Sequence, residues 1–202
     1  LNSLLVLKST VLPSHIKEIA SLIPFLVFNP EFLREKHANN DFINSQLIVF
    51  GGDRDSSIQL AKIYKDHTKC ICKDYIFTDL VAASLIKYSI NSFLATKVTF
   101  FNELSLLFKK SGTNEDWQSF ISALSKDKRI GESHMQVPGH DGRLGFGGAC
   151  LPKDSNAFFA YSEDLDRPLF LLKTAIKTNN KIRASYNTQT LRENSQNIKF
   201  KE

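Results

Sequence analysis

The chain has 202 residues, of which 42% are hydrophobic and 23% are charged, the balance of an ordinary globular protein. This composition excludes wholesale disorder and is enough for one large domain or two small ones. The formal net charge of +5 makes the protein mildly basic. Because the basic residues are spread along the chain in short clusters, they fit a solvated surface or an anionic small ligand, and we expect no nucleic-acid partner.

No apolar run approaches the roughly 18 to 20 residues of a membrane span, so we expect no membrane insertion. The first residues show no signal-peptide pattern, and the lack of an initiator Met suggests a chain that begins inside a larger gene product or a truncated reading frame. The three cysteines, Cys70, Cys72 and Cys150, have no framework spacing, which indicates a reducing, cytoplasmic compartment. A single C-x-C pair is a poor zinc ligand set, so no metal site is expected.

Short apolar runs alternate with helical patterns in residues 1–76. The runs at 4–7, 25–28 and 46–50 are typical of buried strands, and helices are predicted over 14–22 and 53–65. This alternation predicts an α/β fold with a partial parallel sheet, the C-terminal half of a doubly wound, Rossmann-type domain. No G-x-G-x-x-G precedes residue 50, so the half that grips a dinucleotide pyrophosphate is expected to be absent from this chain.

The pattern changes to an all-α one over residues 77–185. Residues 78–110 contain neither Pro nor Gly, and their helical spacing predicts one long helix of about 45 Å. Further helices are predicted over 115–124, with Asn114 as N-cap, and over 154–165 and 169–185. Residues 186–202 are polar and lack a hydrophobic stripe, which predicts a frayed tail.

The glycine-rich residues 131–150 form a predicted long loop, and loops of this length are usually functional. The loop ends in Gly-Phe-Gly-Gly-Ala-Cys-Leu-Pro-Lys-Asp at 145–154. Cys150 thus lies just before a predicted helix N-terminus, where backbone N–H groups favour a thiolate. Lys153 adds positive charge, and Asp154 either caps the helix or acts as a base. The alternative interpretation is a glycine-rich turn with a buried, inert cysteine.

Two other segments carry candidate polar residues. Lys87 and Asn91 lie one turn apart on the long helix, where such a pair can donate hydrogen bonds to a developing oxyanion or can simply belong to a solvated face. Glu31 follows the predicted strand at 25–28, and Thr10 lies at the end of the first predicted strand. Both positions are at the sheet edge where α/β proteins bind ligands. The alternative for the Glu31 segment is helix capping by Asn29, with Pro30 at N1. Capping and ligand binding can both be true of this segment.

Five motifs, in a fixed order, resemble the UDP-glucose/GDP-mannose dehydrogenase family over residues 1 to about 180. In chain order they are Lys8-Ser9-Thr10-Val11, Asn29-Pro30-Glu31-Phe32-Leu33-Arg34-Glu35, Lys87-x3-Asn91-x2-Leu94-Ala95-x-Lys97, Asp127-Lys128-Arg129-Ile130-Gly131 and the 145–154 segment. The last motif is specific by itself, and residues 137–144 look most like bacterial or phage UDP-glucose enzymes. One departure is Lys36, where the family has a glycine.

The resemblance implies an NAD-dependent, four-electron oxidation of UDP-glucose to UDP-glucuronate. Cys150 would attack the aldehyde intermediate to give a thiohemiacetal, and hydride transfer would leave a thioester that water hydrolyses. The other catalytic residues implied are Lys87 and Asn91 for oxyanions, and Asp154, Glu31 and Thr10 for water and protons. The implied substrate contacts are Phe32, Leu33, Gly145, Phe146, Gly147 and Leu151, together with Arg129 from a neighbouring subunit. The implied cofactor contacts are Thr10, Glu35 and Lys153.

The helix predicted over 78–110 resembles the dimerisation helix of the family, which implies a homodimer. The family's first Rossmann half and its C-terminal UDP-binding domain are not found in this sequence, and without the glycine-rich loop the affinity for NAD should fall sharply. Two alternatives therefore stay open. One is a non-catalytic dimerisation or nucleotide-sugar-binding fragment, and the other is a related dehydrogenase of GDP-mannose or of a UDP-N-acetylhexosamine.

Overall fold

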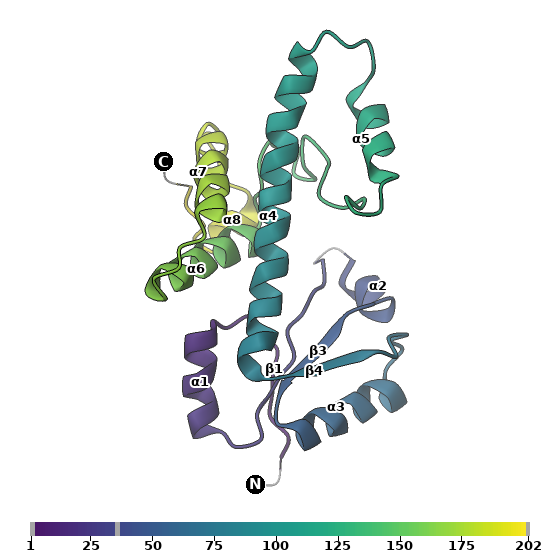
Figure 1. The fold of residues 1–202 in the computed structure, drawn as a ribbon, viewed down its shortest axis with the longest axis vertical. Helices are drawn as coiled ribbons and strands as arrows, with labels where there is room; N and C mark the ends of the chain where they lie inside the picture. The colour runs from purple at the N-terminus through teal and green to yellow at the C-terminus, as the bar shows by residue number, and fades with distance from the viewer. Residues whose placement is uncertain (1–2, 35–36, 201–202) are drawn as a thin grey trace. The chain divides into compact units, whose positions relative to one another are not determined.

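The computed structural model describes residues 3–34 and 37–200, and the chain divides into two compact units, residues 1–89 and 90–202 (Figure 1). The division lies inside the long helix α4 (Leu80–Lys110), whereas the sequence suggested a boundary after residue 76. None of the helices in the described ranges is long and apolar enough to cross a membrane.

The first unit is built on a four-stranded sheet with the order β1-β2-β3-β4 (Figure 1). The strands are β1 (Val6–Leu7), β2 (Val27–Phe28), β3 (Ile48–Gly52) and β4 (Tyr75–Thr78). β1 pairs in parallel with β2, and β3 with β4, so the predicted α/β class is confirmed.

The pairing of β2 with β3 corrects the sequence prediction, because these two strands are antiparallel. A parallel pair needs a crossover connection that returns the chain to the same end of the sheet, usually through a full-length helix. The segment between β2 and β3 contains the six-residue helix α2 (Ala38–Ile43), which is short for such a crossover. The strand β4 was not predicted at all, and its four residues are for the most part only partly buried.

Alternation along β3 creates two hydrophobic cores, one on each face of the sheet. Ile48 and Phe50 pack against α3 (Arg54–His67), whereas Val49 packs against α1 (Pro13–Leu22) and the start of α4. All three side chains are 5% exposed or less, as expected for a strand that is buried on both faces. The apolar runs and helical patterns of the first 76 residues therefore predicted the layers of this unit correctly.

Gly51 of β3 lies close to the start of α4. A Cβ atom at this position would lie 2.5 Å from the Cβ of Ala83 and 2.9 Å from the carbonyl oxygen of Asp79. The second of these neighbours is backbone, so it cannot move aside without shifting the start of the helix. A residue without a side chain is therefore required here.

The second unit contains the rest of α4 and four shorter helices. These are α5 (Trp117–Ser125), α6 (Cys150–Asp164), α7 (Phe170–Ala184) and α8 (Leu191–Ser195). The predicted helices are confirmed to within a few residues, except that α6 begins four residues earlier than expected. The N-cap of α5 is Asp116, whose Oδ1 accepts the Ser119 N–H at 3.0 Å, and not the predicted Asn114.

The predicted frayed tail is wrong for residues 186–200. Helix α8 opens with a capping box in which the Thr190 side chain and the Glu193 carboxylate each accept a backbone N–H of the other residue. Glu193 is also fully buried and forms an ion pair with Arg183 of α7. The polar residues that suggested a tail are therefore in part the partners of a buried charge.

We expect Gly51→Ala to lower the free energy of unfolding of the chain by roughly 1 to 3 kcal/mol, because the added methyl group must displace the start of α4. Urea unfolding measures the change. Ile58→Ala, at an exposed position on α3, is the matched control and should stay within about 0.5 kcal/mol of the wild type. Equal stability of Gly51→Ala and the wild type would contradict the close approach of helix and sheet.

Candidate active site

Cys150 is the first residue of α6, and its side chain is exposed. The alternative of a buried cysteine is therefore wrong, and the reactivity of Cys150 stays a prediction. The N–H groups in the first turn of a helix have no carbonyl partner one turn back, so they favour negative charge nearby. Cys72 offers the contrast within the chain, since it is buried and this burial raises the pKa of its thiol.

Asp154 lies one turn into α6 and is 1% exposed. Its Oδ2 accepts a hydrogen bond from Nδ2 of Asn91 at 2.5 Å, and its other oxygen pairs with the half-exposed ammonium of Lys153. The structure thus brings Asn91 and Asp154 together, 63 residues apart in sequence. Helix capping by Asp154 is excluded, because α6 begins four residues before it.

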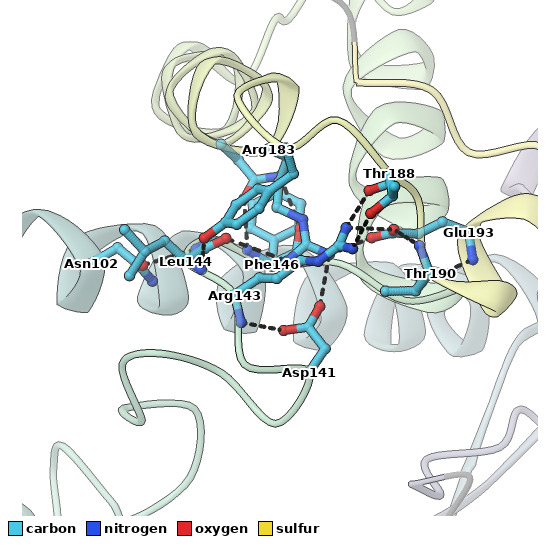
Figure 2. A network of polar contacts seen from close by, with 12 residues as sticks. Asn102, Asp141, Arg143, Leu144, Phe146, Arg183, Thr188, Thr190 and Glu193 are labelled. Carbon is cyan, nitrogen blue, oxygen red and sulfur yellow. Dashed lines mark hydrogen bonds and ion pairs between the residues drawn. The ribbon is translucent and has the colours of Figure 1, made fainter.

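The backbone of the glycine-rich loop is held by buried side-chain amides. Gly145 donates its N–H to Oδ1 of Asn102 on α4 at 2.8 Å (Figure 2). Phe146 donates its N–H to Oδ1 of Asn179 on α7 at 2.6 Å, and Nδ2 of Asn179 donates to the carbonyl of Phe146 at 3.0 Å. The glycine-rich sequence predicts the loop, but no local pattern points to either of these asparagines.

The buried guanidinium of Arg183 is the centre of the polar network shown in Figure 2. It forms ion pairs with Glu193 and, at 2.7 Å, with Asp141, and it donates to the carbonyl of Leu144 at 3.3 Å. A Cβ atom on Gly147 would overlap this guanidinium and would lie 2.5 Å from Glu193 Oε1. The glycine at 147 is therefore required by the buried ion pair beside it.

The ion pairs of Arg183 shift the pKa values of all three charged groups. Burial by itself would lower the pKa of Arg183, but the hydrogen bonds that it donates to Asp141 and Glu193 outweigh burial, so the pKa is raised. Burial likewise would raise the carboxyl pKa values of Asp141 and Glu193, yet hydrogen bonds from Arg183 and from backbone N–H groups lower both. The network is thus stable in its fully charged form.

Arg129 lies in the connection between α5 and the glycine-rich loop, and its side chain is 90% exposed. Its guanidinium pairs with Asp127 in the same turn at 2.5 Å. Lys97 of α4 supports this turn, because its Nζ donates to the carbonyls of Ile130 and Gly131 at 2.8 and 3.2 Å. Arg129, which the resemblance implies to reach the substrate of a neighbouring subunit, is therefore exposed to solvent.

Leu151, next to Cys150 in α6, is half-buried.

In the first unit, Glu31 is held by the two lysines of the predicted motifs. Its carboxylate pairs with Lys8, and its carbonyl accepts a hydrogen bond from Nζ of Lys87 at 2.5 Å. Lys87 is 8% exposed and lies 5.1 Å from the ring centroid of Phe32. Since Asn91 is buried as well, the solvated-face interpretation of the Lys87/Asn91 pair is wrong.

Lys8 connects Glu31 to a buried cluster at the sheet edge. Its Nζ also donates to Oδ1 of Asn29 at 2.8 Å and to the Tyr64 hydroxyl at 2.7 Å. Burial would lower the pKa of Lys8, but its hydrogen bonds to Glu31 and Tyr64 raise it overall. Asn29 in turn donates to the carbonyl of Val49 at 2.9 Å, and residues 29–34 form no helix, so the helix-capping interpretation of Asn29 is wrong.

The remaining predicted residues are placed within their own units. Phe32 and Leu33 are half-buried and help to line a small cavity of about 10 Å³ beside Lys8, the room that one water molecule needs. Thr10 is half-buried in the connection from β1 to α1. Glu35 and Lys36 lie outside the described residues. Within the described ranges, no group of three His, Cys, Asp or Glu side chains could hold a metal ion.

The residues present fit NAD in part. Thr10 offers a hydroxyl after a strand, and Lys153 offers a half-exposed ammonium near the start of α6. The sequence has no G-x-G-x-x-G segment, so this chain supplies no glycine-rich cradle for the pyrophosphate. Contact of either residue with the cofactor stays a prediction, and neither residue supplies that cradle.

Known proteins share this arrangement. The model of the UDP-glucose/GDP-mannose dehydrogenase family, central domain, matches residues 81–181. The chain is 39% identical over 187 residues to a UDP-glucose 6-dehydrogenase of Rickettsia felis, which covers 87% of the chain and 39% of the relative. It is 34% identical over 171 residues to the UDP-glucose 6-dehydrogenase YwqF of Bacillus subtilis, with 84% and 36% covered. A solved UDP-glucose dehydrogenase from Pyrobaculum islandicum is similar with a TM-score of 0.75 and 34% identity, over 88% of this chain and 41% of that one.

The chain belongs to the UDP-glucose/GDP-mannose dehydrogenase family. Within this family it is similar to the UDP-glucose 6-dehydrogenases. It spans about two fifths of the length of the curated relatives it matches.

We expect Glu193→Gln to lower the free energy of unfolding by about 3 kcal/mol near neutral pH, because the buried Arg183 charge then loses a partner. The carboxyl pKa of Glu193 is lowered in the folded protein, so its stabilisation is present above the ordinary value of 4.5 and is lost as the pH falls through the lower folded value. The difference between variant and wild type should therefore shrink below pH 4.5.

Urea unfolding at a series of pH values measures this difference. Glu163→Gln on α6 is the matched control, because that carboxylate is 51% exposed and lies 3.8 Å from Lys173. It should change the free energy of unfolding by less than about 0.5 kcal/mol. A constant effect of Glu193→Gln from neutral pH down to about pH 3 would refute the role of its charge.

Proposed function

We propose that this chain acts in the NAD-dependent, four-electron oxidation of UDP-glucose to UDP-glucuronate, with Cys150 as the nucleophile. The observation that carries the proposal is an exposed cysteine at the first residue of α6, directly after a glycine-rich loop that buried side chains hold. Sequence identity of 39% to a UDP-glucose 6-dehydrogenase supports this substrate.

The proposed chemistry uses the sulfur twice, as a nucleophile and as a leaving group. Once the 6-hydroxyl has been oxidised to an aldehyde, the Cys150 thiolate adds to the carbonyl carbon and leaves an alkoxide on the thiohemiacetal. Loss of hydride from that carbon gives a thioester, and attack by water breaks the C–S bond and releases the carboxylate. When bound, NAD accepts the hydride in each of the two oxidations.

In the second unit, Asn91 and Asp154 are the proposed partners of Cys150. An amide nitrogen has two N–H bonds, so Asn91 can hold Asp154 with one and donate the other to an oxyanion. Asp154 is the proposed group that positions water and carries protons, and Lys153 balances its charge and contacts the cofactor. Leu151 and the Gly145–Gly147 backbone are the proposed lining of the substrate site.

In the first unit, the proposal gives Lys87 the role of stabilising an oxyanion by its charge. Support comes from its burial, since an ammonium away from water interacts more strongly with nearby charge. Glu31 and Thr10 are the proposed proton carriers, and Phe32 and Leu33 the proposed sugar-nucleotide contacts. Arg129, exposed in the second unit, is the proposed contribution to the site of a neighbouring subunit.

Because the covalent step needs the sulfur, we expect Cys150→Ser to reduce NADH formation from NAD and UDP-glucose at least about 100-fold. The absorbance of NADH measures this in the chain alone and in a version completed with the parts of the Rickettsia felis relative that the chain does not span. Cys70→Ser, in the other unit, is the control and should leave the rate unchanged.

The same assay separates the alternatives. Full activity of Cys150→Ser would contradict the mechanism, whereas a completed protein that oxidises GDP-mannose or a UDP-N-acetylhexosamine faster than UDP-glucose would change the substrate. The non-catalytic alternative rests on the chain spanning about two fifths of its relatives. A completed protein that oxidises none of these nucleotide sugars would favour it.

We also propose that α4 mediates a homodimer. Phe93, Phe100 and Leu107 recur at intervals of seven residues, which places them on one face of the helix, and they are 67%, 57% and 65% exposed. Such a stripe of exposed apolar side chains on one helix face is typical of an interaction surface. A second copy presents the same stripe, so one isologous contact covers both.

Phe100→Glu should therefore convert a dimer into a monomer, because two carboxylates would face each other across the contact. Light scattering on the eluting protein measures the mass. Leu22→Glu, which adds the same charge at an 81% exposed site of the first unit, should leave the dimer intact. A wild-type chain that elutes as a monomer would refute the proposed contact.

A further inference from the structure

The glycine-rich segment before Cys150 is ordered without secondary structure of its own. Residues 126–149 contain neither helix nor strand, so Gly145 and Phe146 have no ladder of backbone hydrogen bonds. Buried backbone groups nevertheless need partners. Two side-chain amides supply them: Asn102, 3% exposed on α4, and Asn179, 0% exposed on α7.

Asn179 satisfies both backbone groups of Phe146, as a neighbouring strand would. Its Oδ1 accepts the N–H at 2.6 Å, and its Nδ2 donates to the carbonyl at 3.0 Å. Asn102 accepts the Gly145 N–H at 2.8 Å and is itself oriented by donating to the carbonyl of Val98 at 2.8 Å. Two consecutive residues of the loop are thereby fixed from two helices.

The close approach of Asn179 also accounts for the glycine at 145. A Cβ atom there would lie 2.5 Å from Oδ1 of Asn179, and the φ of Gly145 is +76°, which favours glycine. On the preceding residue, Leu144 donates its N–H to the Tyr186 hydroxyl at 2.8 Å, and its carbonyl accepts from Arg183 at 3.3 Å. Side chains thus hold the backbone continuously from Leu144 to Phe146.

We propose that Asn179, assisted by Asn102, is a positioning residue for Cys150. The two amides fix the loop four residues before the cysteine, so the first turn of α6 begins at a defined place and presents the sulfur to its N–H groups. Without Asn179, the buried N–H and carbonyl of Phe146 would lose their partners, so the amide fixes the course of the loop. The inference rests on the proposed function, in which Cys150 is the nucleophile.

Asn179→Leu tests the proposal, because it keeps the size of the side chain and removes both hydrogen bonds to Phe146. Leu172→Ala is the control on the same helix, since it opens a cavity at a buried apolar position and lowers stability by a different route. Asn102→Ala, which loses a single loop hydrogen bond, carries the same test with a smaller effect should Asn179→Leu fail to fold.

Two measurements on the full chain report the position of the loop and of the sulfur. Hydrogen exchange followed by mass spectrometry covers residues 144–149, and peptide mass spectrometry gives the rate of Cys150 alkylation by iodoacetamide, with Cys70 as internal reference. In Asn179→Leu we expect exchange to rise at least about 10-fold. Alkylation of Cys150 should change by at least about 3-fold, because the sulfur leaves its wild-type position at the start of α6.

In Leu172→Ala, both rates should stay at the wild-type value while the melting temperature falls. Unchanged alkylation of Cys150 in Asn179→Leu, or the same changes in Leu172→Ala, would overturn the positioning role. Neither measurement involves NAD or a nucleotide sugar. A completed protein without dehydrogenase activity would therefore contradict the proposed function but not the positioning role of Asn179. Conversely, an active completed protein with unchanged loop exchange and alkylation in Asn179→Leu would contradict only the positioning role.

Discussion

A guanidinium that is 3% exposed must be neutralised where it stands, and in the second unit Glu193 and Asp141 do so for Arg183. This requirement brings α7, α8 and the loop before Cys150 into one network (Figure 2). It explains why a polar C-terminal segment is packed rather than frayed. It also explains the missing side chain at residue 147, since the charged pair occupies that space.

The first unit has a polar cluster of its own around Lys8, whose side chain is 42% exposed. Lys8 contacts the Glu31 carboxylate, Oδ1 of Asn29 and the Tyr64 hydroxyl. Its partners come from the segment after β2 and from α3, and they hold Lys8, a residue of the first sequence motif. Apolar packing shapes each unit, whereas buried polar contacts fix the segments that carry the candidate residues. Such contacts are strongly directional, which packing alone is not.

Local patterns in the sequence were sufficient for α4, β3 and the placement of Cys150 at a helix start, because periodicity and glycine content are properties of neighbouring residues. They could not give the direction of β2 against β3, which depends on where the intervening chain travels. They also could not reveal that Asn102 holds Gly145, 43 residues away, or that Arg183 pairs with Glu193 across a turn. Pairing of this kind is decided by tertiary packing, and no local spacing encodes it.

The two faces of helix α4 within the second unit differ in exposure. Phe100 is 57% exposed, and Asn102, two residues later, is 3% exposed and bonded to the glycine-rich loop. Two residues turn a helix by more than half a revolution, so one face can meet a second copy while the other fixes the loop. A helix covered along its apolar stripe would fluctuate less, and the amide that holds Gly145 would move less with it. If α4 forms the proposed dimer contact, that contact and the proposed positioning of Cys150 both depend on the rigidity of this one helix.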